Sequence, residues 1–121
     1  MSLAGALLAA TVTVTLTPAM AVDQGREIVR LGLGQTSDVQ LHDVVLRSIG
    51  GDMLFCGKVN IRSADGSLSG WRDLLVVVSG NPNDRTLITS TSQLERSIIG
   101  SSCSHGARVD GRDYSAALNP R

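Results

Sequence analysis

Two cysteines, Cys56 and Cys103, are the residues of this 121-residue chain best suited to covalent chemistry. A cysteine nucleophile needs a thiolate with a base beside it, and the two histidines, His42 and His105, are the available bases. An even cysteine count without a C-x-x-C motif is instead typical of a structural disulfide in an oxidising compartment. We expect Cys56 and Cys103 to pair, and the closed loop would stabilise the fold by roughly 4 kcal/mol.

The acidic residues stand singly, so a hydrolase would need carboxylates that converge in space. Asp43 and Asp73 are the pair that the expected strands bring nearest. Lys58 would lie between them and favour the ionised form of both, whereas a general acid must be protonated. The arrangement therefore indicates a surface charge ladder.

Other candidate sites have weak patterns. His105, Asp110 and Asp113 have a spacing that matches no metal-site type. Gly32 and Gly34 form a lone G-x-G without the third glycine of a nucleotide-binding loop. We predict no catalytic residue, no metal ligand and no cofactor.

Length and composition further limit the functional classes to which this protein can belong. A chain of this length holds one domain. Its 11 basic and 11 acidic side chains are interspersed, which argues against nucleic acid as a partner. One Trp, one Tyr and one Phe are too few for a base-stacking platform.

The first 21 residues read as an export signal. No charged side chain occurs from Met1 to Val22, and Ala19 and Ala21 are small residues suited to a signal peptidase cut after Ala21. The Lys or Arg that usually opens such a signal is missing, although an upstream start would explain this. A retained segment of this length could instead anchor the chain in a membrane. We predict a signal peptide over residues 1–21 and a periplasmic or secreted protein.

Periodicity and turn residues predict an α+β fold over residues 22–103: an antiparallel meander of three to four strands between two helices. The elements expected are a short helix over 23–33, strands over 39–47, 53–62, 71–78 and 85–89, and a helix from the capping box Ser92 to Glu95 that ends at Gly100. Leu94 and Ile98 would form the buried stripe of that last helix. Residues 104–121 are polar, so we expect a mostly disordered tail.

Two tight reversals would set the strand register. A two-residue loop at Gly50–Gly51 would pair Asp43 with Lys58 and Val45 with Cys56. A second at Asp65–Gly66 would pair Lys58 with Asp73 and Cys56 with Leu75. The same registers would place Asn60 beside Trp71 and His42 on the face opposite Cys56, which excludes that thiol–imidazole pair.

One stretch of the chain carries a resemblance. Cys56-Gly57-Lys58-Val59-Asn60, followed by Gly66 to Trp71 and the apolar run Leu74 to Val78, resembles a pattern in small exported bacterial proteins of uncharacterised function. It covers about 25 residues, a quarter of the mature chain, and departs at Leu68, where the pattern has tyrosine. The resemblance implies export and a cysteine-bearing hairpin, without an activity.

The interpretation that follows is a small, exported, non-enzymatic binding or accessory domain of the bacterial envelope or extracellular space. Its partner would be another envelope or extracellular protein, bound through a patch of Trp71, Asn60 and Lys58, because exposed tryptophans often anchor interfaces. Gly57 indicates a β-bulge or a close approach of another segment near this patch. The alternatives are an envelope hydrolase with dispersed acid–base residues and a membrane-anchored structural protein.

Overall fold

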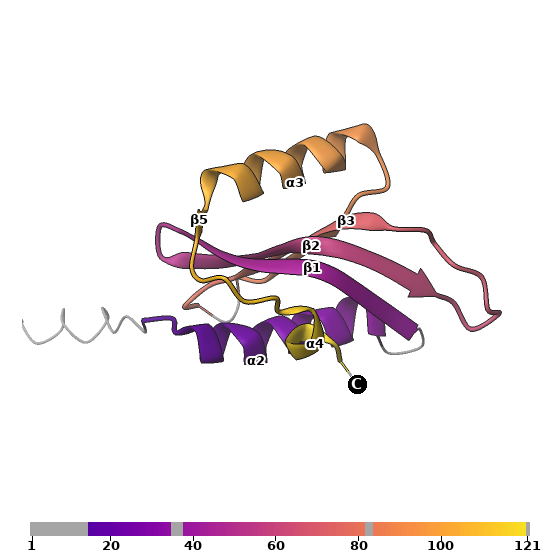
Figure 1. Ribbon diagram of the computed structural model, residues 1–121, viewed down its shortest axis with the longest axis horizontal. Coiled ribbons are helices and arrows are strands. Elements are labelled where there is room, and N and C mark those ends of the chain that lie inside the picture. Colours follow the sequence, from indigo (N-terminus) through magenta and orange to yellow (C-terminus); the bar gives the residue numbers. More distant parts are fainter. Residues whose placement is uncertain (1–14, 35–37, 82–83, 121) are drawn as a thin grey trace, which may run out of the picture.

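The computed structural model describes residues 15–34, 38–81 and 84–120. Three layers are stacked, with the sheet in the middle, α3 on one face, and α2 and α4 on the other (Figure 1). The elements in chain order are α2 (Pro18–Val29), the π-helical turn η1 (Arg30–Gly34), β1 (Asp38–Ile49), β2 (Asp52–Arg62), β3 (Arg72–Val78), β4 (Thr86–Thr89), α3 (Gln93–His105), β5 (Ala107–Arg108) and α4 (Ser115–Leu118).

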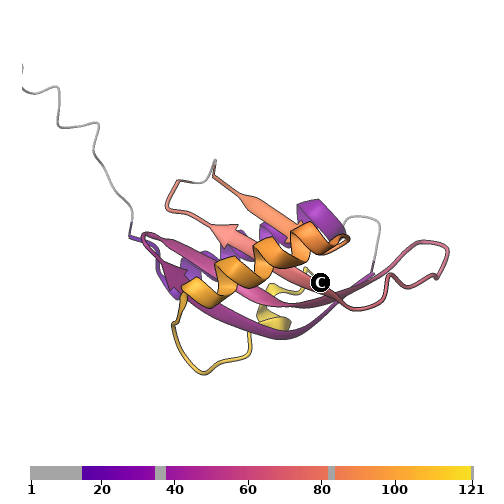
Figure 2. The ribbon, with the colours of Figure 1, turned by 90° about the horizontal axis from the view of Figure 1, so that it is seen from above.

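The sheet is antiparallel with strand order β4-β3-β2-β1-β5: strands β1 to β4 form a meander, and β5 pairs with β1 at the opposite edge from β4. Figure 2 shows α3 running obliquely across this sheet. The predicted α+β class is confirmed, as is the packing of an N-terminal and a C-terminal helix on an antiparallel sheet.

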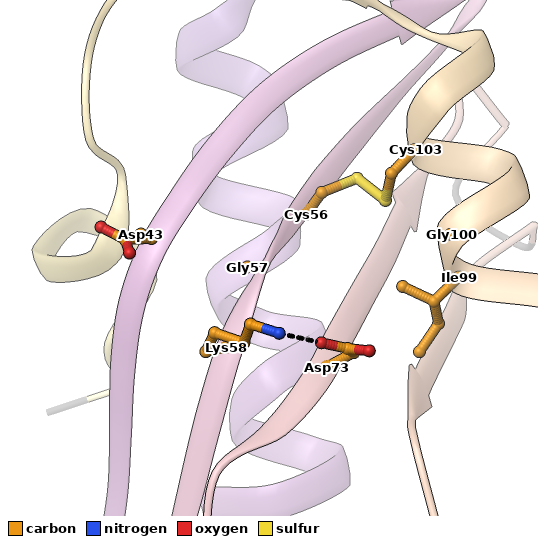
Figure 3. Close-up of a pocket in the computed structure, with 8 residues that line it drawn as sticks. All are labelled: Asp43, Cys56, Gly57, Lys58, Asp73, Ile99, Gly100 and Cys103. Carbon is orange, nitrogen blue, oxygen red and sulfur yellow. Dashed lines mark hydrogen bonds and ion pairs between the residues drawn. A yellow bond between two sulfur atoms is a disulfide. The ribbon is translucent and has the colours of Figure 1, made fainter. Parts of the chain in front are cut away.

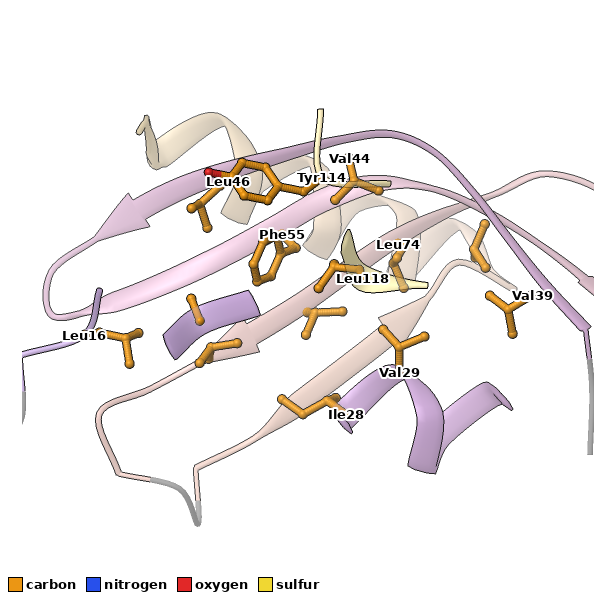
Figure 4. Close-up of a cluster of buried hydrophobic side chains, with 14 residues drawn as sticks. Leu16, Ile28, Val29, Val39, Val44, Leu46, Phe55, Leu74, Tyr114 and Leu118 are labelled. Atoms are coloured by element: carbon orange, nitrogen blue, oxygen red, sulfur yellow. The ribbon is translucent and has the colours of Figure 1, made fainter. Parts of the chain in front are cut away.

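The main core lies between the sheet and the α2–α4 layer (Figure 4). Phe55 of β2 and Tyr114 meet at its centre, with ring centroids 5.7 Å apart in an edge-to-face arrangement. A smaller cluster on the other face joins Leu54, Leu75 and Ile99. The sheet is therefore buried on both faces over its central part, and this explains the apolar runs in β2 and β3.

Helix α2 begins earlier than Asp23, where the sequence places it. Thr17 is the N-cap, and its hydroxyl accepts a hydrogen bond from the Met20 amide at 3.2 Å. The expected cleavage bond after Ala21 lies inside α2, and the Ala21 side chain is fully buried. Residues 1–14 of the expected signal lie outside the described part, so the signal peptide itself stays a prediction.

Helix α3 begins as predicted, with Ser92 accepting from the Glu95 amide. The predicted end at Gly100 is wrong, because the helix continues to His105. The predicted buried stripe is also wrong: Leu94 is 70% exposed and Ile98 is 42% exposed. The buried apolar residue is Ile99, which lies one turn before Cys103 on the side that faces the sheet.

The predicted disordered tail over residues 104–121 is wrong for residues 104–120, which the structure describes as ordered. Residues 107–120 cross the β1 edge and return under the sheet, where Tyr114 and Leu118 are buried. The Val109 amide donates to the Leu46 carbonyl, and the Tyr114 amide donates to the Val44 carbonyl, each at 2.9 Å. Two buried side chains one helical turn apart, spaced among polar residues, are enough to order this segment.

Candidate functional site

A β-bulge in β1 organises the site. Asp43 and Val44 together lie opposite the single residue Gly57 of β2. Asp43 has a φ of 53°, in the left-handed region that most side chains avoid. The bulge lets Leu41 and Val44 both face the α2 layer although they are three residues apart.

This bulge corrects the predicted β1–β2 register. The predicted pair of Asp43 with Lys58 is wrong, and His42 occupies that position. Because Lys58 and Cys56 share a face of β2, His42 lies on the Cys56 face, contrary to the prediction. The pairing of Val45 with Cys56 is confirmed.

Gly57 is required by the bulge. A Cβ at this position would lie 2.7 Å from Val44 Cγ2 and 2.8 Å from Val44 Cα. The C-terminal segment supplies a hydrogen-bond acceptor to the bulge: the Val44 amide donates to Ser115 Oγ at 3.2 Å. The predicted bulge or close approach at Gly57 is confirmed.

The β2–β3 register follows the prediction where it matters for the site. Lys58 pairs with Asp73, and Cys56 pairs with Leu75. The Lys58 ammonium makes an ion pair and hydrogen bond with Asp73 Oδ1. The Asp65–Gly66 loop is wider than predicted, since Arg62 bridges to Leu68.

The predicted disulfide is present: Cys56 and Cys103 are bonded, with Cα atoms 6.2 Å apart. Both thiols are therefore consumed, and neither is available as a nucleophile. The bond ties α3 to the centre of β2.

A groove of about 280 Å³ lies beside the disulfide, between α3 and the sheet (Figure 3). Its charged side chains are Asp43 at one side and the Lys58–Asp73 pair on neighbouring strands. The remaining lining residues are Cys56, Gly57, Ile99, Gly100 and Cys103. Because Lys58 and Asp73 form an ion pair with each other, their two charges balance within the groove.

Trp71 lies beyond this groove, on the sheet face that carries α3. The residue before it, Gly70, has a φ of 83°, which brings the chain out of the hairpin loop and into β3. The indole is 54% exposed, and its ring centroid lies 5.8 Å from that of His42. An exposed tryptophan thus reaches across β2 to β1.

Asn60 of β2 lies beside Trp71 in the strand register. The last β2–β3 pair is Val59 with Arg72, so the next residues on the two strands are Asn60 and Trp71. Asn60 is only 7% exposed, and its Oδ1 has no hydrogen-bond partner. A buried carbonyl oxygen without a donor is costly and uncommon.

We name the set His42, Lys58, Asn60, Trp71 and Asp73 the Trp71 patch. Three of its members, Lys58, Asn60 and Trp71, are those that the sequence indicated. His42 was missed as a member because a regular β1 would place it on the other face. A signal was available: the apolar positions of β1 change parity between Leu41 and Val44, which requires an extra residue in between.

The residues considered for metal binding are engaged locally. His105 Nδ1 lies 2.6 Å from the Ser101 carbonyl oxygen. The Tyr114 hydroxyl donates to Asp110, and that hydrogen bond lowers the pKa of Asp110. Asp113 accepts from the Ser115 hydroxyl, which lowers the pKa of this carboxyl as well. Both carboxylates act as turn-forming acceptors.

Fold and site together define a small antiparallel α+β domain with a disulfide-tethered helix and an exposed tryptophan patch. No family model, no curated protein and no solved structure matches the chain. Among the described residues, no helix has the length and apolar character needed to cross a bilayer.

Proposed function

We propose that this protein is an exported, non-enzymatic binding or accessory domain of the bacterial envelope or extracellular space, and that the Trp71 patch contacts its partner. The observation that supports the proposal most directly is the exposure of the Trp71 side chain. It is the single tryptophan of the chain and is more than half exposed, although Phe55 and Tyr114 are buried. Large aromatic side chains are enriched at the energetic centres of interfaces.

The surroundings of Trp71 support a binding role. Its position is held from two sides, by the turn at Gly70 and by the His42 ring. The ion pair of Lys58 with Asp73 supplies accessible polar groups beside the ring. A fixed aromatic anchor with polar neighbours loses little conformational entropy on binding.

Export is supported by the disulfide. Bonds of this kind persist in oxidising compartments and are rare in the cytosol of most cells. The uncharged segment before Asp23 supports the same conclusion from the sequence. Intact mass of the protein recovered from the source cell tests export, because removal of a signal shortens the chain at its N-terminus. Cleavage after Ala21 would leave a chain that begins at Val22 and lacks the first turn of α2.

The binding role is tested by retention on washed envelope material from the source cell. We expect the wild-type protein and Leu31→Ala to be retained and Trp71→Ala to be released. Leu31 is a matched control, because it is 48% exposed and lies in η1, on the opposite side of the sheet. Equal retention of Trp71→Ala and wild type would show that the Trp71 patch does not contact the partner.

A further inference from the structure

The two charged side chains of the Trp71 patch, Lys58 and Asp73, balance each other. The Lys58 ammonium is paired with Asp73, and His42 Nε2 lies 3.3 Å from Asp43 Oδ2 at the edge of the patch. These side chains remain accessible: the Lys58 side chain is 52% exposed and that of His42 is 65% exposed. The patch therefore offers hydrogen-bond donors and acceptors side by side without a dominant charge, which does not favour an ionic ligand.

The neighbours of Trp71 on this face are polar. In typical protein–protein hot spots the aromatic anchor enters a desolvated, well-packed pocket. Here His42, Lys58 and Asn60 adjoin the indole on the neighbouring strands. An aromatic face carries partial negative charge and attracts weakly positive C–H groups, so an exposed indole suits a ligand with an apolar face and polar edges.

Asn60 lies beneath this accessible surface. The residue lies directly beside Trp71 in the strand register. It is only 7% exposed and its Oδ1 is buried, so a ligand on the indole does not reach it. The polar side chains within reach of such a ligand are Lys58, Asp73 and His42.

We infer that the Trp71 patch binds a saccharide, with a neutral pyranose unit of a glycan stacked on Trp71 and hydroxyls bonded to Lys58 and Asp73. Sugar rings combine a C–H face with hydroxyls that both donate and accept, which suits the exposed indole and the balanced pair of Lys58 with Asp73. The inference rests on the proposed function and names the chemical class of the partner as glycan instead of protein.

The first test uses three neutral probes: a β-1,4-linked N-acetylglucosamine tetrasaccharide, cellotetraose and maltotetraose. Because Trp71 is the single tryptophan, its fluorescence reports the patch directly. We expect at least one probe to produce a saturable change in Trp71 emission, and no change with any of the three would overturn the saccharide inference. In calorimetric titrations, Trp71→Ala should bind that probe roughly tenfold more weakly or worse, and Leu31→Ala should bind it like wild type.

The second test separates the glycan from a protein partner. Washed envelope material is treated with protease, or with periodate, which cleaves vicinal diols. The periodate treatment includes glycoside hydrolases that cut β-1,4-linked N-acetylglucosamine, because the internal units of such chains have no vicinal diol. Retention of wild type is then compared with that of Trp71→Ala. Loss of Trp71-dependent retention after periodate, with survival after protease, supports the saccharide inference. Survival after periodate with loss after protease overturns it and leaves the proposed binding role standing. No Trp71-dependent retention on untreated material overturns the proposed function itself.

Discussion

Gly57 lies so close to Val44 that any side chain at residue 57 would overlap the backbone of β1. A Cβ there would approach Val44 Cα to 2.8 Å, and backbone cannot move aside as a side-chain tip can. We therefore expect Gly57→Ala to lower the free energy of unfolding by about 2–3 kcal/mol, in the range of overpacked cores. Urea denaturation measures this loss.

The control for that substitution is Gly51→Ala in the β1–β2 turn, where nothing lies within 4 Å of the added Cβ. This variant should stay within about 0.5 kcal/mol of wild type, as open surface positions do. A Gly57→Ala protein as stable as Gly51→Ala would show that the bulge does not require glycine.

The start of α2 gives a second prediction. Leu16 is 8% exposed, Ala21 is fully buried, and Thr17 caps the helix. A chain that begins at Val22 should be less stable than one that begins at Thr15 by roughly 3 kcal/mol, the sum of one buried leucine and one N-cap. Thermal and urea denaturation of the two chains measure the difference. Equal stability would mean that residues before Val22 do not stabilise the fold, as expected if they are only a signal.

Much of the fold could be predicted because local rules and tertiary packing agree over β2 and β3. The Gly50–Gly51 turn sets the pairing of Val45 with Cys56, and the reversal at Asp65–Gly66 sets the pairing of Lys58 with Asp73. The disulfide followed from cysteine count alone. The strand registers depend on short-range sequence signals, whereas the disulfide depends on composition.

The predictions were wrong where a single residue changes which face of a strand or helix the following side chains occupy. The extra residue Asp43 moves His42 to the Trp71 face. Aspartate tolerates the left-handed region better than most residues, but its presence in a strand does not by itself mark a bulge. In α3, the bond at Cys103 sets which side faces the sheet, so Leu94 is exposed despite its helical spacing with Ile98. Tyr114 and Leu118 were missed because these two buried side chains order a segment that is otherwise polar.

Two helical glycines should respond in opposite ways to alanine. At Gly100 the added Cβ meets nothing within 4 Å, so Gly100→Ala should stabilise the protein by about 1 kcal/mol through helix propensity. At Gly25 the Cβ would lie 2.9 Å from both Phe55 and Leu118, which are buried. Overpacking there should outweigh the same propensity gain and cost about 1 kcal/mol net. Parallel melting curves compare the two variants, and a shift of the same sign in both would contradict the packing argument.

The Tyr114–Asp110 hydrogen bond should make stability depend on pH. The Tyr114 hydroxyl donates to Asp110 Oδ2 at 2.6 Å and lowers the pKa of Asp110. A lowered carboxyl pKa contributes stability that is present above the ordinary value of about 4 and is lost as pH falls through the folded-state value. Tyr114→Phe should therefore lower the Tm at neutral pH, and its difference from wild type should narrow in acid below about pH 4.

At alkaline pH the titration of the Tyr114 phenol should change stability in the opposite direction. Burial, and then the bond to Asp110, raise the pKa of Tyr114. Its contribution is complete below about pH 10 and is lost as pH rises through the higher folded-state value, so wild type should lose stability there relative to Tyr114→Phe. A difference in Tm that is constant from acid to alkali would contradict both arms.

The disulfide should matter most for α3, because that helix has little else that holds it. Ile99 is its one buried residue among those described, whereas the α2 layer packs Ile28, Val29 and other core side chains. A Cys56→Ala, Cys103→Ala double variant should lose roughly 4 kcal/mol. Amide hydrogen exchange should rise over Gln93–His105 more than over β1 and β2, since α3 can then separate from the sheet without opening the main core. Exchange that rises equally in all three elements would mean that the smaller cluster and the main core unfold as one cooperative unit.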